Sequence, residues 1–201
     1  MAGIEAVVFD IGNVLLRWDP HGFYDRVIGA ERRRALWGAV DLEAMNLRSD
    51  AGEDIADLVA ETAAAHPAHA GDIRRWHDDW LQMAGPVIEE TAGMLRALRA
   101  RGMPCFALSN FGVRTLAMAD AAYPELADFD RRFISGALRM MKPDPAIYAH
   151  VETETGIAPQ HLFFTDDSPA NIAAARARGW QVHLFEGPRG LSERLRAEGL
   201  L

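Results

Sequence analysis

Short apolar runs alternate with helical patterns along most of the chain. Residues 4–9 (IEAVVF) are rich in β-branched side chains and predict a buried strand. Runs of the same kind predict further strands at residues 103–108, 133–135, 162–165 and 181–185. Helical patterns separate them, at residues 86–101, 111–121, 145–155 and 168–178. Continuous apolar strands that alternate with helices are typical of an α/β fold with a Rossmann-like, doubly wound parallel sheet.

The alternation breaks between residues 17 and 85, where no strong strand pattern occurs. Ala-rich and Leu-rich stretches instead predict helices at residues 22–27, 31–40, 53–65 and 70–83. The chain therefore leaves the sheet after its first strand and returns to it later. We expect an α/β core made of residues 1–16 plus 86–201, with residues 17–85 inserted as a helical cap.

Polar side chains stand where the predicted strands end. Asp10 closes the first strand, Ser109 and Asn110 close the second, and Asp166 and Asp167 close the fourth. In an open parallel sheet, sites form at the carboxyl ends of the strands, where the strand order changes direction. We therefore expect these five residues to meet at one edge of the sheet.

A cluster of this composition suits phosphoryl transfer. Neighbouring carboxylates repel one another, and a divalent cation removes that repulsion. Mg²⁺ prefers carboxylate and carbonyl oxygens, together with water and a substrate phosphate. Lys142 adds a positive charge and is the one lysine among 21 Lys and Arg residues, which suggests a place where the wide guanidinium of Arg will not serve. Ser109 and Asn110 add donors for an anion, which completes the requirements for a carboxylate nucleophile acting on phosphorus.

Composition and charge argue against two kinds of binding partner, nucleic acid and membranes. The formal net charge is −8, and an acidic protein is a poor match for nucleic acid or an anionic membrane. No apolar stretch approaches the ~20 residues of a membrane span. Cys105 is the single cysteine, and the N-terminus lacks the basic start of a secretory signal. We expect a cytoplasmic protein with a small phosphorylated substrate and neither a nucleic-acid nor a membrane partner, and the sequence does not decide between monomer and homodimer.

Four segments resemble the motifs of the haloacid dehalogenase-like (HAD) hydrolase superfamily. They are VVFDIGNVLL at 7–16, ALSN at 107–110, KPDPAIY at 142–148 and FFTDDSPANIAAARARGW at 163–180. Their order and spacing match over essentially the whole chain. The DIGN and DDSPANI segments look closest to small bacterial members that act as sugar-phosphate phosphatases. Residues 17–85 stand where the family carries its helical cap.

The resemblance implies a role for each residue that handles phosphate. Asp10 would be the nucleophile and form an aspartyl-phosphate that water then hydrolyses. Ser109 and Asn110 would hold the transferring phosphoryl group. Lys142 would neutralise Asp10 and the phosphate.

The resemblance also implies a magnesium site. Asp10 would be one ligand, and Gly12 would offer its backbone carbonyl. Asp167 would bind Mg²⁺, with Asp166 as a second ligand or as a support through water. Asn171, one turn into the following helix, would support these ligands.

The chain departs from the family at Gly12. Most phosphatases of the family carry a second aspartate there, which acts as general acid and base. General acid catalysis contributes about 10²–10⁴-fold, so a substitute is needed. Asp19 and His21, which follow soon after the motif, are the candidates that the sequence offers.

Two other functions remain open at this stage. A 2-haloacid dehalogenase uses the same aspartate nucleophile on carbon, needs no metal and is compatible with Gly12. The pair Asp166 and Asp167 argues against it, because without a cation these charges oppose a carboxylate substrate. A non-catalytic phosphate-binding or partner-binding protein of this fold is the third alternative, and the joint presence of Asp10, Lys142 and Asp167 argues against that.

Overall fold

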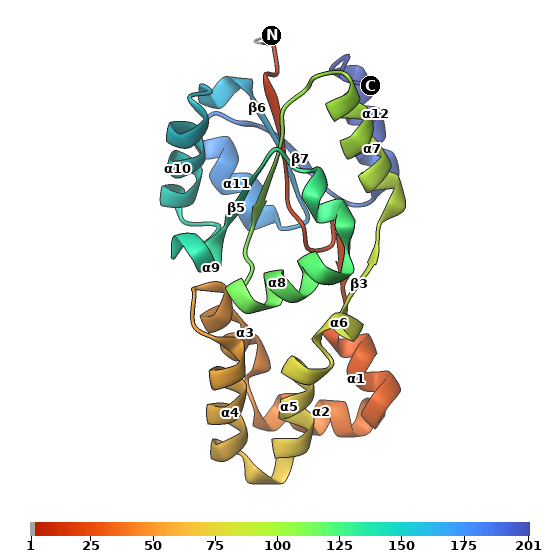
Figure 1. Cartoon of the computed structure of the whole chain (residues 1–201), viewed down its shortest axis with the longest axis vertical. Helices are drawn as coiled ribbons and strands as arrows, with labels where there is room; N and C mark the ends of the chain where they lie inside the picture. Colours follow the sequence, from red (N-terminus) through yellow and green to blue (C-terminus); the bar gives the residue numbers. More distant parts are fainter. Residues whose placement is uncertain (1–2) are drawn as a thin grey trace.

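Five parallel strands form the central sheet of the computed structural model, which describes residues 3–201. In spatial order they are β5 (Arg131–Ile134), β4 (Cys105–Ser109), β1 (Ala6–Phe9), β6 (Leu162–Asp166) and β7 (Gln181–Leu184). The chain moves outward from β1 to β4 and β5, then returns to β6 on the other side of β1 (Figure 1). This reversal makes the sheet doubly wound, and the predicted α/β class is confirmed.

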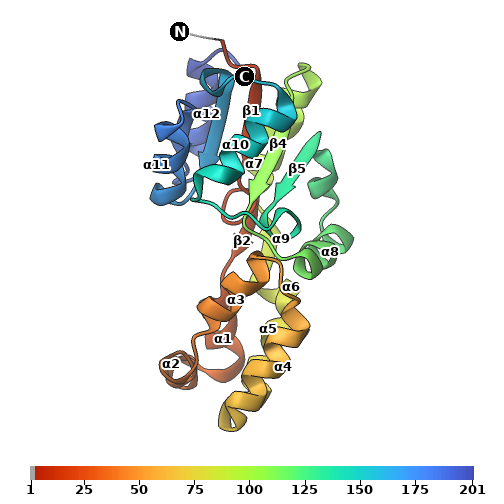
Figure 2. The same cartoon turned by 90° about the vertical axis from the view of Figure 1, so that its left-hand side faces the viewer.

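Helices cover both faces of the sheet. Alternate residues of β1 point to opposite faces, as the two-residue period of a strand requires: Val7 and Phe9 to one, Ala6 and Val8 to the other. The first face packs against α7 (Glu89–Ala100), α8 (Val113–Ala122) and α12 (Pro188–Ala197). The second packs against α10 (Pro145–Thr155) and α11 (Pro169–Ala177) (Figure 2). Every residue of β1, β4 and β6 is buried, which explains their uninterrupted apolar sequences.

Short elements complete the core. The turns η2 (Pro124–Asp128) and η3 (Pro159–His161) lead into β5 and β6, and α9 (Ser135–Leu138) follows β5. Helix α7 begins at Glu89, three residues later than the pattern predicts. Pro86 and Val87 belong instead to β3 (Ala84–Val87), which pairs antiparallel with β2 (Leu16–Trp18). This two-stranded ribbon was not predicted, because three or four residues are too few to show a period.

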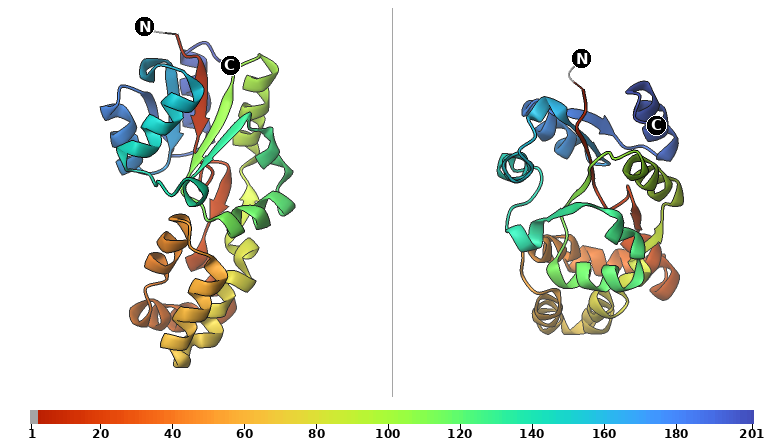
Figure 3. Two further views of the ribbon diagram at one scale, coloured as in Figure 1. Left: turned by 60° about the vertical axis from the view of Figure 1, so that its left-hand side comes forward. Right: turned by 45° about the horizontal axis from the view of Figure 1, so that its top comes forward.

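The segment between β2 and β3 is helical and lies at one end of the molecule (Figure 3). Its elements are α1 (Pro20–Ile28), α2 (Ala30–Ala39), α3 (Leu42–Asp50), α4 (Ile55–Ala65), η1 (Pro67–His69), α5 (Ala70–Asp78) and α6 (Trp80–Met83). The stretch predicted as one helix from 70 to 83 is divided at Asp79. Helix α3 was not predicted, since Leu47 is exposed while Ser49 is buried and no apolar stripe marks its inner face.

The end of α3 lies against the core. Figures 1 and 2 both show α3 directly below α9, and the two helices are in contact. Among residues 3–201, no helix has the length and apolar character that a membrane crossing requires.

Candidate active site

The carboxyl ends of the three middle strands bring the predicted residues together. Ser109 and Asp166 are the last residues of β4 and β6, and Asp10 follows β1, which lies between these two strands. Lys142 reaches the same edge from the segment before α10 and pairs with both carboxylates. The site therefore lies where the strand order changes direction, which is where an open parallel sheet binds its ligands.

Asp10 is buried and held by three donors. Its Oδ1 accepts hydrogen bonds from the Ser109 hydroxyl at 2.7 Å and from the Ile11 backbone N–H at 2.7 Å, and it pairs with Lys142 Nζ at 2.9 Å. Burial raises the pKa of Asp10 to about 6, and the charge of Asp166 adds to this, while Lys142 and Ser109 lower it. These contacts fix the carboxylate in place, but the positive charge of Lys142 does not fully offset the effect of burial on its pKa.

Lys142 is the one cation between two buried carboxylates. Its Nζ lies 2.6 Å from Asp166 Oδ2, and its side chain is 1% exposed. Burial lowers the pKa of this lysine, but the charges and hydrogen bonds of Asp10 and Asp166 outweigh it, so the pKa is raised and the ammonium persists. The slim stem of lysine suits this position, where the Phe164 ring lies 5.6 Å from Nζ.

Asn110 holds the backbone of Lys142. Its Oδ1 accepts a hydrogen bond from the Lys142 N–H, and its Nδ2 donates to the Lys142 carbonyl, both at 2.8 Å. These two bonds fix the segment that delivers the lysine to the site. A role for Asn110 in holding a phosphoryl group stays a prediction, and its side chain has this structural task as well.

Three carboxylates form a candidate metal site. Asp10, Asp166 and Asp167 each offer an oxygen, and these oxygens lie within 4.8 Å of one another. When all three are ionised they carry three negative charges and Lys142 compensates one. The remainder of two matches a divalent cation with a preference for oxygen ligands. The residues present therefore fit Mg²⁺.

Neighbouring side chains orient these carboxylates. Asp166 is fully buried and accepts hydrogen bonds from Asn171 Nδ2 at 3.0 and 3.1 Å and from the Ser168 N–H at 2.8 Å. Asn13 Nδ2 donates to Asp167 Oδ2 at 2.9 Å. Gly12 lies beside Asn13 in the turn after β1, and a Cβ there would meet nothing within 4 Å.

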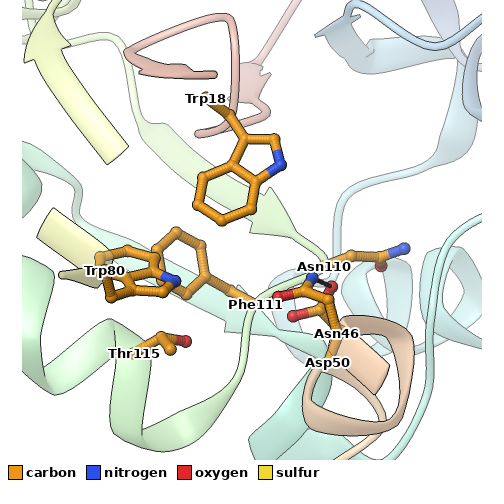
Figure 4. A pocket seen from close by; sticks show the side chains of 7 residues that line it. All are labelled: Trp18, Asn46, Asp50, Trp80, Asn110, Phe111 and Thr115. Carbon is orange, nitrogen blue, oxygen red and sulfur yellow. Dashed lines mark hydrogen bonds between the residues drawn. The ribbon is translucent and has the colours of Figure 1, made fainter. Parts of the chain in front are cut away.

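A cavity of about 180 Å³ lies next to the residues that follow β4 (Figure 4). Asn110 and Phe111, which follow β4, line it from the core. Its remaining walls are Trp18, Asn46, Asp50, Trp80 and Thr115. The Trp80 ring packs against both aromatic neighbours, with ring centroids 5.8 Å from Trp18 and 5.5 Å from Phe111. The cavity thus has one aromatic wall and one wall of amide and carboxylate groups, and Asn110 is the predicted site residue that lines it.

The two substitutes that the sequence offered for a missing acid have other contacts. Asp19 caps α1, where it accepts a hydrogen bond from the Gly22 N–H at 2.8 Å. The His21 ring packs on Trp37 with centroids 4.8 Å apart, and its Nε2 lies 3.5 Å from Glu43. Neither Asp19 nor His21 lines the cavity.

Asp50 and Asn46 were missed by sequence reasoning. They lie on a helix that the pattern did not reveal, outside all four of the segments that carry motifs. One local signal was present, since Asp50 ends α3, and a negative charge at the C-terminus of a helix opposes the helix dipole.

Comparisons with known proteins show the family of this chain. The family model described as haloacid dehalogenase-like hydrolase matches residues 4–179. Haloacetate dehalogenase H-2 of Moraxella sp. (strain B) is 27% identical over 198 residues, which cover 90% of this chain and 85% of that protein. Phosphoglycolate phosphatase of Chromobacterium violaceum is 29% identical over 190 residues, with 88% and 82% covered.

A solved structure shares the fold. A HAD family enzyme from Bacteroides thetaiotaomicron, in complex with magnesium and inorganic phosphate, has a TM-score of 0.71 to this chain. It is 21% identical, and the match covers 90% of this chain and 93% of that one. One relative by sequence is named a dehalogenase and another a phosphatase, so the choice between these reactions depends on the site itself.

Proposed function

Because this chain belongs to the haloacid dehalogenase-like hydrolase family and is therefore a hydrolase, we propose that it is a Mg²⁺-dependent phosphatase of small phosphorylated metabolites, with sugar phosphates as the substrate class. The observation that carries the proposal is the cluster of Asp10, Asp166 and Asp167 around a single buried lysine. That cluster has the charge and the oxygen donors for a divalent cation and for a phosphate bound to it.

Asp10 is the nucleophile of this proposal. Its carboxylate attacks phosphorus, the bond from phosphorus to the leaving oxygen breaks, and an aspartyl-phosphate forms, which water then hydrolyses to inorganic phosphate. The bonds from Ser109 and Ile11 orient the carboxylate for this attack. Lys142 keeps Asp10 ionised and offers its charge to the phosphoryl oxygens.

The metal would be held by Asp10, Asp166, Asp167 and the backbone carbonyl of Gly12. When bound, Mg²⁺ neutralises the crowded carboxylates and the charge that develops on the phosphoryl group. The solved relative from Bacteroides thetaiotaomicron, which holds magnesium and inorganic phosphate, supports the assignment.

A metal-independent 2-haloacid dehalogenase is the second candidate, favoured by the Moraxella relative. Such an enzyme binds a carboxylate substrate beside its nucleophile. Without a cation, the three aspartates and Lys142 leave two negative charges at that place, which would repel the substrate. A non-catalytic phosphate-binding or partner-binding protein would not need this complete set.

The experiment is a measurement of phosphate release from a panel of sugar phosphates and p-nitrophenyl phosphate. It compares Mg²⁺ with EDTA and the wild type with Asp10→Asn, and Asp57→Asn on an exposed face of α4 is the matched control. We expect turnover that requires both Mg²⁺ and Asp10. Halide release from 2-haloacids in EDTA, with no phosphate release from any ester, would overturn the proposal.

A further inference from the structure

A phosphatase of this kind needs a proton donor for its leaving group, and Gly12 has no side chain to supply one. The leaving alcohol departs as a strong base unless it is protonated as the bond to phosphorus breaks. The following inference rests on the proposed function and concerns the group that gives this proton.

Asp50 faces the place where a leaving group would lie. Under the proposed function Asn110 lies at the transferring phosphoryl group, and it also lines the cavity, so the rest of a bound ester would extend into this space. Asp50 lines that cavity opposite its aromatic wall, together with Asn110 from the core (Figure 4). Its position is fixed, because Asn46 Nδ2 donates to Asp50 Oδ2 at 3.0 Å and Asn46 Oδ1 accepts from Trp76 Nε1 at 3.2 Å.

The end of α3 is anchored to the core at this point. The Asp50 carbonyl accepts a hydrogen bond from the Ser135 hydroxyl at 2.6 Å, and the same hydroxyl accepts from the Phe111 N–H at 2.9 Å. A few residues on, Asp54 makes a bidentate ion pair with Arg114 of α8. These contacts hold the Asp50 carboxyl group over the cavity.

The environment of Asp50 keeps its proton available at neutral pH. Burial raises the pKa of Asp50 to about 7, and the charge of Asp10 adds to this. The backbone N–H of Gly112 and the charge of Lys142 lower it by less. Asp10 and Lys142 are the charged groups that act on this carboxyl, and both belong to the reaction centre.

We propose that Asp50 is the general acid and base of this enzyme, supplied by the helical segment in place of the missing side chain at Gly12. The Asp50 carboxyl group gives its proton to the leaving oxygen as the bond to phosphorus breaks. The resulting carboxylate then takes a proton from the water that attacks the aspartyl-phosphate. One water is consumed, one alcohol and one phosphate are released, and both aspartates return to their starting state.

The test compares leaving groups, because only a poor leaving group needs the proton. Asp50→Asn keeps the size of the side chain but has no proton to give. We measure kcat/KM, which reports the steps up to formation of the aspartyl-phosphate. For a sugar phosphate it should fall by about 10²–10⁴-fold, and for p-nitrophenyl phosphate it should stay within about fivefold of the wild type.

A second readout separates the acid role from the base role. With p-nitrophenyl phosphate, Asp50→Asn should release one equivalent of nitrophenolate in a burst and then turn over slowly, since hydrolysis of the intermediate lacks its base. In the wild type, kcat/KM for the sugar phosphate should decline above pH about 7, and Asp50→Asn should lack this decline. Asp57→Asn, an exposed aspartate on the next helix, is the matched control and should behave as the wild type.

Two outcomes would overturn the inference. An equal loss of kcat/KM on both substrates would mean that Asp50 only positions the helical segment, and no loss on either would mean that it plays no part. A wild type that releases phosphate from neither substrate would contradict the proposed function itself, which is a separate failure.

Discussion

The position of Lys142 requires a lysine and not an arginine. It lies between Asp10 and Asp166 in a place without access to solvent, at the end of a segment that Asn110 fixes. A guanidinium is wider than an ammonium and cannot approach both carboxylates along the same path. We therefore expect Lys142→Arg to lower kcat/KM by about 10²–10³-fold, the cost typical of losing one well-placed hydrogen-bond donor from a reaction centre.

Steady-state kinetics with Mg²⁺ present checks this expectation, and a thermal melt shows whether the variant is folded. Arg176→Lys on α11 is a suitable control for the exchange between the two basic residues. Wild-type kcat/KM in Lys142→Arg would show that the site needs only a positive charge and not the shape of lysine.

We propose that Gly12 contributes its backbone carbonyl rather than the absence of a side chain. A Cβ at this position would meet nothing within 4 Å, so space does not require glycine. We expect Gly12→Ala to change kcat/KM by no more than about twofold and stability by about 0.5 kcal/mol or less. A loss of tenfold or more, measured in the same phosphate assay, would mean that the substrate or the metal occupies the space beside Gly12.

The raised pKa of Asp50 has a consequence for stability that is independent of activity. The folded protein retains a proton on Asp50 up to pH about 7, whereas an aspartate in the unfolded chain loses its proton near the ordinary pKa of 3.8. Folding therefore becomes less favourable as the pH rises between these values, and the cost is complete above the folded pKa. Asp50→Asn removes this cost.

Urea unfolding in EDTA at pH 5 and pH 8 measures the effect. Since Asp50 keeps part of its surface open to the cavity, we expect the variant to gain about 1–2 kcal/mol over the wild type on going from the lower pH to the higher. The pKa of Asp10 is raised in both proteins, so only the part of its shift that comes from repulsion by Asp50 enters the difference. A difference that does not change with pH would show that Asp50 is ionised in the folded state at neutral pH.

Residues next to a strand end could be predicted, and those brought in by tertiary contact could not. Asp10, Ser109 and Asp166 follow apolar runs directly, so a local pattern locates them. Asp50 is placed by the docking of α3 on the core, which no local pattern records. For the same reason the sequence offered Asp19 and His21, which are near the motif along the chain but have their partners among the helices.

Helices, too, could be predicted where a local signal marks them and not elsewhere. Helix α10 has both ends at the predicted residues, because Asp144 caps it, Pro145 begins it and Gly156 ends it with a φ of 69°. Helix α12 was missed because Leu191 and Leu195 are its only buried residues, a pair too small to show a helical period.

Gly112 sets the distance between α3 and the core. A Cβ there would lie 2.3 Å from the Ser49 hydroxyl oxygen and 3.0 Å from the Thr115 hydroxyl oxygen, so the Ser49 side chain would have to turn away. It would also lie 3.3 Å from the Ser49 backbone carbonyl, so α3 would have to give by a few tenths of an ångström. Because Asp50 follows Ser49, we expect Gly112→Ala to lower kcat/KM for a sugar phosphate about tenfold or more, with a smaller effect for p-nitrophenyl phosphate.

Gly71→Ala in α5 is the matched control, since its Cβ would meet nothing within 4 Å and alanine favours a helix. If Gly112→Ala has the kinetics of the wild type on both substrates, the close approach of α3 is not needed for catalysis.

The candidate site lies where the helical segment meets the α/β core. We propose that residues 17–85 form a cap and that residues 1–16 plus 86–201 form the core. The paired strands β2 and β3 connect the core to helices α1 to α6, which lie between them in the sequence. In the proposed mechanism the core supplies the nucleophile, the lysine and the metal ligands, while the helical segment supplies one wall of the cavity. The absence of nucleic-acid and membrane partners stays a prediction from the acidic composition, and the cytoplasmic location stays a prediction from the cysteine content.

The most direct test is mass spectrometry of the protein quenched in acid during turnover of p-nitrophenyl phosphate with Mg²⁺. We expect the peptide that contains Asp10 to gain the mass of one phosphoryl group, which hydroxylamine removes and which Asp10→Asn lacks. Phosphate release by a protein whose Asp10 peptide stays unmodified, in a quench fast enough to trap a burst of nitrophenolate, would contradict nucleophilic catalysis by Asp10.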